Sequence, residues 1–199
     1  MEITFTLNGK KVTPQIDADT LLIDLVRDLG CYSVKRGCET SNCGLCTVFM
    51  DDQPILSCSI LAARVDGHKI DTLEGLQEEA AEFGAFIANQ GAEQCGFCNP
   101  GMIMNAIALF REIPDPSEEE IKEYLAGNLC RCSGYEGQLR GILDFLEYKK
   151  NKETIQDSLS MLEEEKCTEE AAVMALFTAG AVGMVIAQQA SIAGAQGGC

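Results

Sequence analysis

The sequence predicts an α+β fold in which a small sheet comes first and helices follow. Near the N-terminus, the apolar residues Ile3, Phe5 and Leu7 alternate with polar ones, which is the period of a half-buried strand. From Leu73 onward, the apolar residues recur at helical spacing instead. With 199 residues, 46% of them hydrophobic, the chain can form one large domain or two small ones with real cores.

A hairpin opens the predicted sheet. Asn8-Gly9 is a strong two-residue turn signal, and Pro14 places the returning strand near an edge, because proline cannot donate to a strand ladder. Asp19 and Thr20 then predict the cap of a helix with leucines on one face.

Two further segments complete the predicted sheet. Residues 47–50 and 54–58 are expected to form a second hairpin around residues 51–53, with Cys58 on its second strand. A short strand over residues 68–72 would close a small mixed sheet packed on the one helix.

Four helices are predicted to follow. The first runs over residues 76–87 and the fourth over residues 136–150. The boundaries between them are marked by a glycine stop, an N-cap asparagine before a first-turn proline, and a capping box, at Gly91, at Asn99 with Pro100, and at Ser117 with Glu120. Four short helices with brief connections predict a compact bundle.

Charge and cysteine content limit the possible functions. The formal net charge of −16 argues against a nucleic-acid or anionic-lipid surface. The N-terminus carries an acid and no apolar signal segment, so a cytoplasmic location with reduced thiols is expected. Eleven cysteines there point to metal rather than to disulfides. The only histidine, His68, is expected to be a solvent-facing turn residue and argues against a histidine-rich metal site.

A first set of four cysteines follows the spacing C-x4-C-x2-C-x11-C: Cys38, Cys43, Cys46 and Cys58. The first three match the plant-type [2Fe–2S] pattern. Two irons bridged by two sulfides need four thiolates, two on each iron. Gly37 and Gly44 give the loop the freedom to turn backbone amides toward the sulfurs, and such hydrogen bonds tune the potential. The spacing therefore predicts a [2Fe–2S] cluster.

A second set follows C-x2-C-x31-C-x-C: Cys95, Cys98, Cys130 and Cys132. Each pair lies at a predicted helix boundary, so the two pairs are expected to meet across the bundle. A zinc ion with four cysteine ligands remains an alternative, because spacing alone separates zinc poorly from [2Fe–2S]. The plant-type loop in the same chain favours a second cluster.

Residues 1 to about 150 resemble the iron–sulfur subunit, or N-terminal iron–sulfur domain, of the molybdenum hydroxylases, the xanthine dehydrogenase and aldehyde oxidoreductase family. The match is carried by SVKRGCETSNCGLC with Cys58, then by QCGFCNPG and GNLCRCSGY. It implies a β-grasp ferredoxin-like domain over residues 1–75 and a four-helix bundle domain over residues 76–150. Each of the two domains would hold one [2Fe–2S] cluster.

The resemblance also implies partners. Electrons would pass from molybdopterin in a separate large subunit to the helical cluster, then to the β-grasp cluster, then to FAD in a third subunit. The residue matching Cys132 would contact the pterin through its ligand sulfur, and the residue matching Gln94 through its side chain. The substrate, a purine, another N-heterocycle or an aldehyde, would bind outside this chain. The alternative is a free-standing two-cluster ferredoxin.

Two residues outside the cysteine sets carry expectations of their own. Cys31 is expected to be a small buried apolar residue. Arg131, between two cysteines of the second set, is expected either at a subunit interface or in an internal salt bridge.

Residues 151–199 have no counterpart in the family pattern. They are predicted to form an acidic linker and an Ala/Gly-rich helix in which residues 171–187 carry no charge and small residues recur every fourth position. Such a seam permits close helix packing. We expect packing against a subunit or a second copy, with membrane attachment and a partly ordered extension as alternatives.

Overall fold

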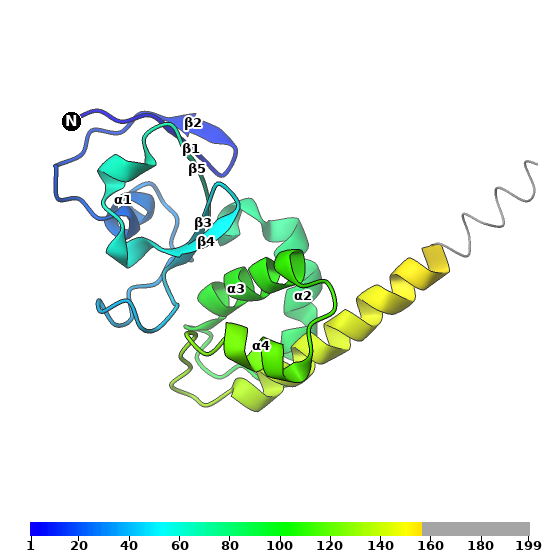
Figure 1. Cartoon of the computed structure of the whole chain (residues 1–199). Helices are drawn as coiled ribbons and strands as arrows, with labels where there is room; N and C mark the ends of the chain where they lie inside the picture. Colours follow the sequence, from blue (N-terminus) through cyan, green and yellow to red (C-terminus); the bar gives the residue numbers. More distant parts are fainter. Residues whose placement is uncertain (157–199) are drawn as a thin grey trace, which may run out of the picture. The chain divides into compact units, whose positions relative to one another are not determined.

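The computed structural model describes residues 1–156 (Figure 1). The chain divides into two compact units, Met1–Glu147 and Tyr148–Cys199, and the sheet and both cysteine sets belong to the first. The predicted apolar tail helix lies outside the described residues. Within residues 1–156, no helix has both the length and the apolar character needed to cross a membrane.

A five-stranded mixed sheet forms the N-terminal part of the first unit, in the order β2-β1-β5-β3-β4. The strands are β1 Phe5–Leu7, β2 Lys10–Val12, β3 Thr47–Met50, β4 Gln53–Leu56 and β5 Lys69–Asp71. Strand β1 pairs parallel with β5, whereas the pairs β1–β2, β3–β4 and β3–β5 are antiparallel. The predicted mixed sheet is confirmed, and β2 is an edge strand, as Pro14 indicates.

Both hairpins turn through residues with positive φ. Asn8 and Gly9 have φ of 49° and 76°, and Asp51 and Asp52 have φ of 49° and 66°. A two-residue turn of this hand matches the twist of its strands, and aspartate tolerates the left-handed region. The carboxylate of Asp51 also accepts a 2.9 Å hydrogen bond from the Lys69 backbone N–H, which joins the second turn to β5.

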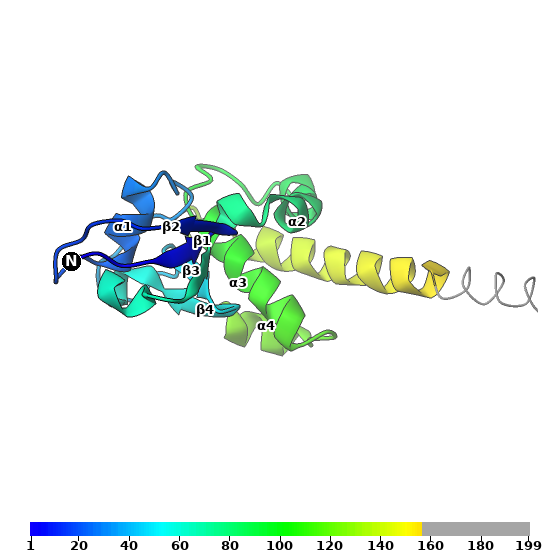
Figure 2. The same ribbon diagram turned by 90° about the horizontal axis from the view of Figure 1, so that it is seen from above.

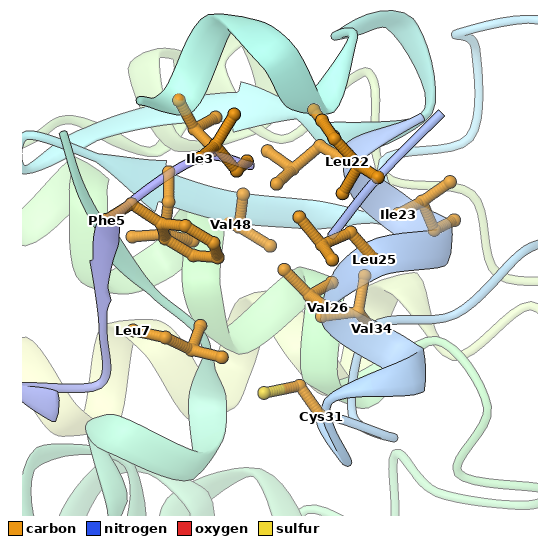
Figure 3. Close-up of a cluster of buried hydrophobic side chains, with 14 of the residues drawn as sticks. Ile3, Phe5, Leu7, Leu22, Ile23, Leu25, Val26, Cys31, Val34 and Val48 are labelled. Atoms are coloured by element: carbon orange, nitrogen blue, oxygen red, sulfur yellow. The ribbon is translucent and has the colours of Figure 1, made fainter. Parts of the chain in front are cut away.

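Helix α1, Leu22–Asp28, covers one face of the sheet (Figure 3). It begins later than the sequence indicates, and Leu21 at the cap position makes no side-chain capping bond. The Thr20 hydroxyl instead accepts from the Asp17 N–H at 3.1 Å. The Leu22 N–H donates to the carbonyl of Ile60 at 2.8 Å. A carbonyl from a distant part of the chain thus accepts a hydrogen bond from the first turn of α1, where a side-chain cap was expected.

The helical part contains α2 Gln77–Asn89, α3 Asn99–Glu112, α4 Glu118–Tyr124 and a further helix over residues 135–156. Phe83, Phe110 and Phe145 lie together in its core, with ring centroids 5.2 Å apart in each pair. The predicted capping box is confirmed, since Ser117 and Glu120 exchange both of its hydrogen bonds.

The start of α3 differs from the prediction by one residue. Cys98 occupies the cap position, and Asn99 is the first residue of the helix. The Asn99 amide donates to the Glu93 carboxylate at 2.7 Å instead of capping α3. Pro100, expected at the first helical position, is the second residue of α3, still in the first turn, where its missing N–H costs nothing.

Strand β3 has a core on each face, because neighbouring side chains on a strand point in opposite directions. Val48 packs in the core under α1, whereas Phe49 packs with Met104 and Ile107 of α3. Helix α3 therefore lies on the opposite side of the sheet from α1 (Figure 2). This packing brings the start of α3 against the loop that carries the first cysteine set.

Candidate metal centres

The loop over residues 37–46 presents backbone amides to the first sulfur. The N–H groups of Thr40 and Asn42 each donate to Cys38 Sγ at 3.4 Å. Positive φ angles at Glu39 and Ser41, of 57° and 58°, give the chain this turn. The two hydrogen bonds stabilise the thiolate and lower the pKa of Cys38 to about 6.

Glycine has two different roles in this loop. Gly44 has a φ of +69°, the freedom that the sequence indicates. Gly37 provides space instead, since a Cβ there would lie 2.4 Å from Leu45 Cδ1 and 3.1 Å from Cys43 Sγ. A side chain at Gly37 would therefore require the end of the Leu45 side chain to move aside.

Cys58 lies in a short 3-10 turn, Ser57–Ser59, and not on the preceding strand as predicted. The turn is held by Ser57, whose hydroxyl and N–H donate to the carbonyl of Cys46 at 2.7 Å and 3.2 Å. This places the Cys58 sulfur against that of Cys46. Burial raises the pKa of Cys46 to about 11; the Cys58 backbone N–H acts against this shift, and the Cys58 side chain adds to it.

The second set lies where two connections meet. Cys95 and Cys98 are in the connection between α2 and α3, and Cys130 and Cys132 precede the helix over residues 135–156. The sulfurs of Cys132 and Cys95 are 3.5 Å apart. The predicted meeting of the two pairs is thus present in the structure.

Two hydrogen-bond donors, one just before and one within the helix over residues 135–156, bind the sulfurs of Cys130 and Cys98. The Gly134 N–H donates to Cys130 Sγ at 3.4 Å, and the Gln138 side chain donates to Cys98 Sγ at 3.6 Å. Burial raises the pKa of Cys98 to about 11, with its neighbour Cys130 contributing. Burial acts to raise the pKa of Cys130, but hydrogen bonds from the Gly134 N–H, the Cys98 side chain and the backbone of Cys132 and Ser133 together outweigh it, so the pKa is lowered.

The eight sulfurs contact one another in pairs: Cys38 with Cys43, Cys46 with Cys58, Cys95 with Cys132, and Cys98 with Cys130. Two thiolates for each iron is what a [2Fe–2S] cluster requires. A structural zinc ion instead holds four sulfurs at about 2.3 Å from one point. In residues 1–156, no three cysteine, histidine or carboxylate side chains converge in a way that would hold one metal ion. The donor pairs fit di-iron clusters.

A cavity of about 530 Å³ lies among members of both sets. Its lining includes Cys38 and Cys43 from the first set and Cys95, Cys98 and Cys130 from the second. Phe97 also lines it, and the Lys35 ammonium lies 5.9 Å from the centre of that ring. The two cysteine sets thus share one thiol-rich cavity.

The other predicted site residues lie on the surface of the helical part. Gln94 and Cys95 are exposed, and Cys132 is half-buried. Arg131 is exposed and lines the cavity. Phe97, Leu129 and Tyr135 are 46%, 48% and 45% exposed, so an apolar rim surrounds these groups.

The structure places the remaining candidates as expected. Cys31 is 4% exposed in the core under α1 (Figure 3). The side chain of His68 is 43% exposed near the second hairpin turn, where its Nδ1 lies 2.5 Å from the Asp51 carboxylate.

Sequence reasoning missed Gln138, a buried side chain that reaches a cysteine sulfur. The signal was available, because Gln138 stands four residues before Ile142 on the apolar face of the last helix. A carboxamide on an apolar face needs a partner, since burying it unpaired is costly.

Two family models match the described part of the chain. The 2Fe-2S iron-sulfur cluster binding domain matches residues 5–75, and the [2Fe-2S] binding domain matches residues 72–143. The chain is thus a protein with two [2Fe–2S]-binding domains.

Relatives of known function narrow the class. The nicotinate dehydrogenase small FeS subunit of Eubacterium barkeri is 43% identical over 136 residues, which are 67% of this chain and 87% of the relative. The xanthine dehydrogenase iron-sulfur-binding subunit of Escherichia coli O157:H7 is 41% identical, over 71% of this chain and 92% of the relative. The chain belongs to this family of small iron–sulfur subunits of the xanthine dehydrogenase type.

Solved structures agree with the sequence relatives. A chain of quinoline 2-oxidoreductase from Pseudomonas putida 86 superposes with a TM-score of 0.69 at 35% identity, over 76% of this chain and 96% of the other. The aldehyde oxidoreductase from Desulfovibrio gigas gives a TM-score of 0.68 at 34% identity, over 76% of this chain and 17% of the other.

The tail matches a model of a different family. Residues 157–199 match the model described as serine dehydratase alpha chain. The sequence interpretation treated this segment as a helix without a counterpart in the molybdenum hydroxylases and did not identify that likeness. The iron–sulfur relatives therefore match the first part of the chain, and the tail is similar to a different protein family.

Proposed function

We propose that this chain carries electrons between the catalytic centre and the acceptor of a multi-subunit molybdenum hydroxylase. The observation that supports this most is the arrangement of eight cysteines as four contacting sulfur pairs in two sets. The chain's own side chains have no group that stores a single electron at biological potentials. Two [2Fe–2S] clusters supply that chemistry.

Each cysteine set is assigned to one cluster. Cys38, Cys43, Cys46 and Cys58 would hold the first, within a β-grasp domain over residues 1–75. Cys95, Cys98, Cys130 and Cys132 would hold the second, within a four-helix bundle over residues 76–150. Amide donors at Cys38 and at Cys130 support this assignment, because N–H groups that point at sulfur are what an anionic cluster needs.

The exposed side of the second set supports the proposed direction of electron flow. Gln94 and Cys132 lie at the surface beside the apolar rim of Phe97, Leu129 and Tyr135. This face would dock on a large subunit that holds molybdopterin, with the sulfur of Cys132 and the amide of Gln94 at the pterin. The first cluster would then deliver electrons to a subunit that holds FAD.

Substrate would bind in the large subunit and not in this chain. The relatives' names include nicotinate, nicotine, caffeine and xanthine enzymes, and we propose an N-heterocycle as the substrate class. The cytoplasmic location and the packing of residues 151–199 against another subunit also remain proposals.

Anaerobic purification of the intact complex tests the function. We expect about four irons and four acid-labile sulfides per copy of this chain, and two distinct electron paramagnetic resonance (EPR) signals after reduction. N-heterocyclic substrate should reduce both clusters in the complex, but not in this chain alone. A colourless chain that holds zinc, or clusters that dithionite reduces but no substrate of this class does, would contradict the proposal.

A further inference from the structure

A buried polar network joins the loops of the two cysteine sets. The Asn105 side-chain amide of α3 donates to the Asn128 side-chain oxygen at 2.8 Å and to the Thr47 hydroxyl at 3.2 Å. The Thr47 hydroxyl donates to the carbonyl of Gly44 at 2.8 Å, and the Asn128 amide approaches the same carbonyl at 3.5 Å. The four groups form a closed ring of contacts.

Each end of this network is next to candidate ligands in the sequence. Gly44 follows Cys43, Thr47 follows Cys46, and Asn128 stands two residues before Cys130. Asn105 is the only member on a regular helix, in the middle of α3. It therefore ties both loops to an element that is packed against the sheet through Phe49.

Asn105 is half-buried, its two side-chain partners are buried, and the members of the network depend on one another. Thr47 and Asn128 are 3% and 8% exposed. Within the described residues, no buried side-chain nitrogen or oxygen lacks a partner, and without Asn105 both Thr47 and Asn128 would lose a donor. A buried polar group that loses its partner draws in water or moves toward one. The loops would then be free to shift separately.

We propose that Asn105 is a positioning residue that fixes the separation and orientation of the two clusters, and so the rate of electron exchange between them. This rests on the proposed function, because it assumes a cluster on each cysteine set. Electron tunnelling between two centres falls steeply with their separation. A hydrogen-bonded link that keeps two ligand loops in register therefore acts directly on that step.

The test is Asn105→Leu in the full complex, because leucine has a similar size and no donor. We expect both clusters to remain by iron content. The magnetic splitting between the two reduced clusters depends on the inverse cube of their distance. We expect this splitting to broaden from one value to a distribution of values. Electron exchange between the clusters should slow. Hydrogen exchange at the Leu129 N–H, bonded to the Cys43 carbonyl at 3.0 Å, should become faster.

Gln90→Leu is the matched control. Gln90 also makes two side-chain hydrogen bonds, to Asp144 at 2.5 Å and from Arg140 at 3.0 Å, but these involve no member of the network. It should leave splitting, electron exchange and Leu129 protection unchanged. If Asn105→Leu fails to fold, Asn105→Ser, which keeps a shorter donor, takes its place and should show the same changes to a smaller extent.

Two outcomes separate this inference from the proposed function. A variant with both clusters, wild-type splitting and wild-type Leu129 protection would overturn the positioning role while leaving the clusters in place. Wild-type protein without clusters would overturn the proposed function. Faster Leu129 exchange in Asn105→Leu would then still support the loop-holding part of the inference.

Discussion

The backbone N–H of Leu129 donates a 3.0 Å hydrogen bond to the carbonyl oxygen of Cys43. Leu129 directly precedes Cys130, so one hydrogen bond joins the backbone of a candidate ligand in the first set to the neighbour of one in the second. The two cysteine loops are thus in contact, and changes at this junction should affect both centres.

Removal of one ligand should affect one cluster only. We expect Cys132→Ala to lose the helical cluster and keep the other, because its sulfur pairs with Cys95 and with no sulfur of the first set. Cys31→Ala should keep both, since Cys31 lies in the core under α1. EPR of the reduced complex checks this, and two cluster signals in Cys132→Ala would refute the assignment.

Two helical glycines should respond in opposite ways to alanine. A Cβ at Gly101 of α3 would lie 2.4 Å from the Gly44 carbonyl oxygen, whereas one at Gly84 of α2 meets nothing within 4 Å. We expect Gly101→Ala to destabilise by about 1–3 kcal/mol through overpacking. Gly84→Ala should stabilise by about 0.5–1 kcal/mol. Chemical denaturation of both variants measures the difference, and equal effects would argue against the close contact.

Loss of the Gln138 amide should shift one potential. Its donor lies 3.6 Å from Cys98 Sγ, and hydrogen bonds to cluster sulfurs help to set the reduction potential. A donor stabilises the extra negative charge of the reduced cluster, so Gln138→Leu should lower the midpoint potential of the helical cluster alone. An EPR-monitored redox titration, with Gln90→Leu as control, checks this. Equal shifts in both variants would count against a specific role.

Tyr124 should make stability fall at alkaline pH. Burial raises the pKa of Tyr124 to about 12, with Glu112 adding to the shift, against about 10 in an unfolded chain. The protonated phenol therefore favours the folded state, fully below pH of about 10 and progressively less as pH rises toward about 12. The free energy of unfolding of wild type should fall relative to Tyr124→Phe over this window.

Urea unfolding across that pH range measures the relative stability. Tyr32→Phe is the control, because Tyr32 is 64% exposed. A constant difference between wild type and Tyr124→Phe would contradict the prediction.

Removal of residues 157–199 should leave both clusters intact. All eight candidate ligands lie between residues 38 and 132, and the truncation removes only Cys167 and Cys199 among the cysteines. Iron content and EPR signals should match those of the full chain, and a lost signal would place a ligand in the tail. A smaller mass of the complex after truncation would support the proposed packing role.

Local patterns in the sequence predicted most of the fold. The Asn8-Gly9 turn, the Ser117–Glu120 capping box and the five strands all follow from short-range chemistry, and the structure contains them. The errors are at Cys58, which lies in a 3-10 turn and not on the strand, and at the starts of α1 and α3, where other partners replace the expected caps. Thr20 and Asn99 have suitable side chains for capping, but each bonds elsewhere. Propensity could not reveal those partners.

The sequence predicted the candidate ligands of the site but not the residues that hold their loops in place. Cysteine spacing indicated two sets of four, and it also suggested that the pairs of the second set meet. It could not reveal that Asn105 and Asn128 are joined, because they are far apart in the sequence and look like ordinary polar residues. The sequence could not reveal the role of Gly101 either, because only the fold places this residue directly against the Gly44 backbone.

The close approach of Gly101 to Gly44 also constrains how such a protein can evolve. The sheet part and the helical part cannot change independently at this contact, because a side chain added on one would occupy the space of the other's backbone. If recombination replaced one half with that of a distant homologue, the product would fold well only if the incoming half also had glycine at this contact. The two halves should accordingly be inherited together, as one module.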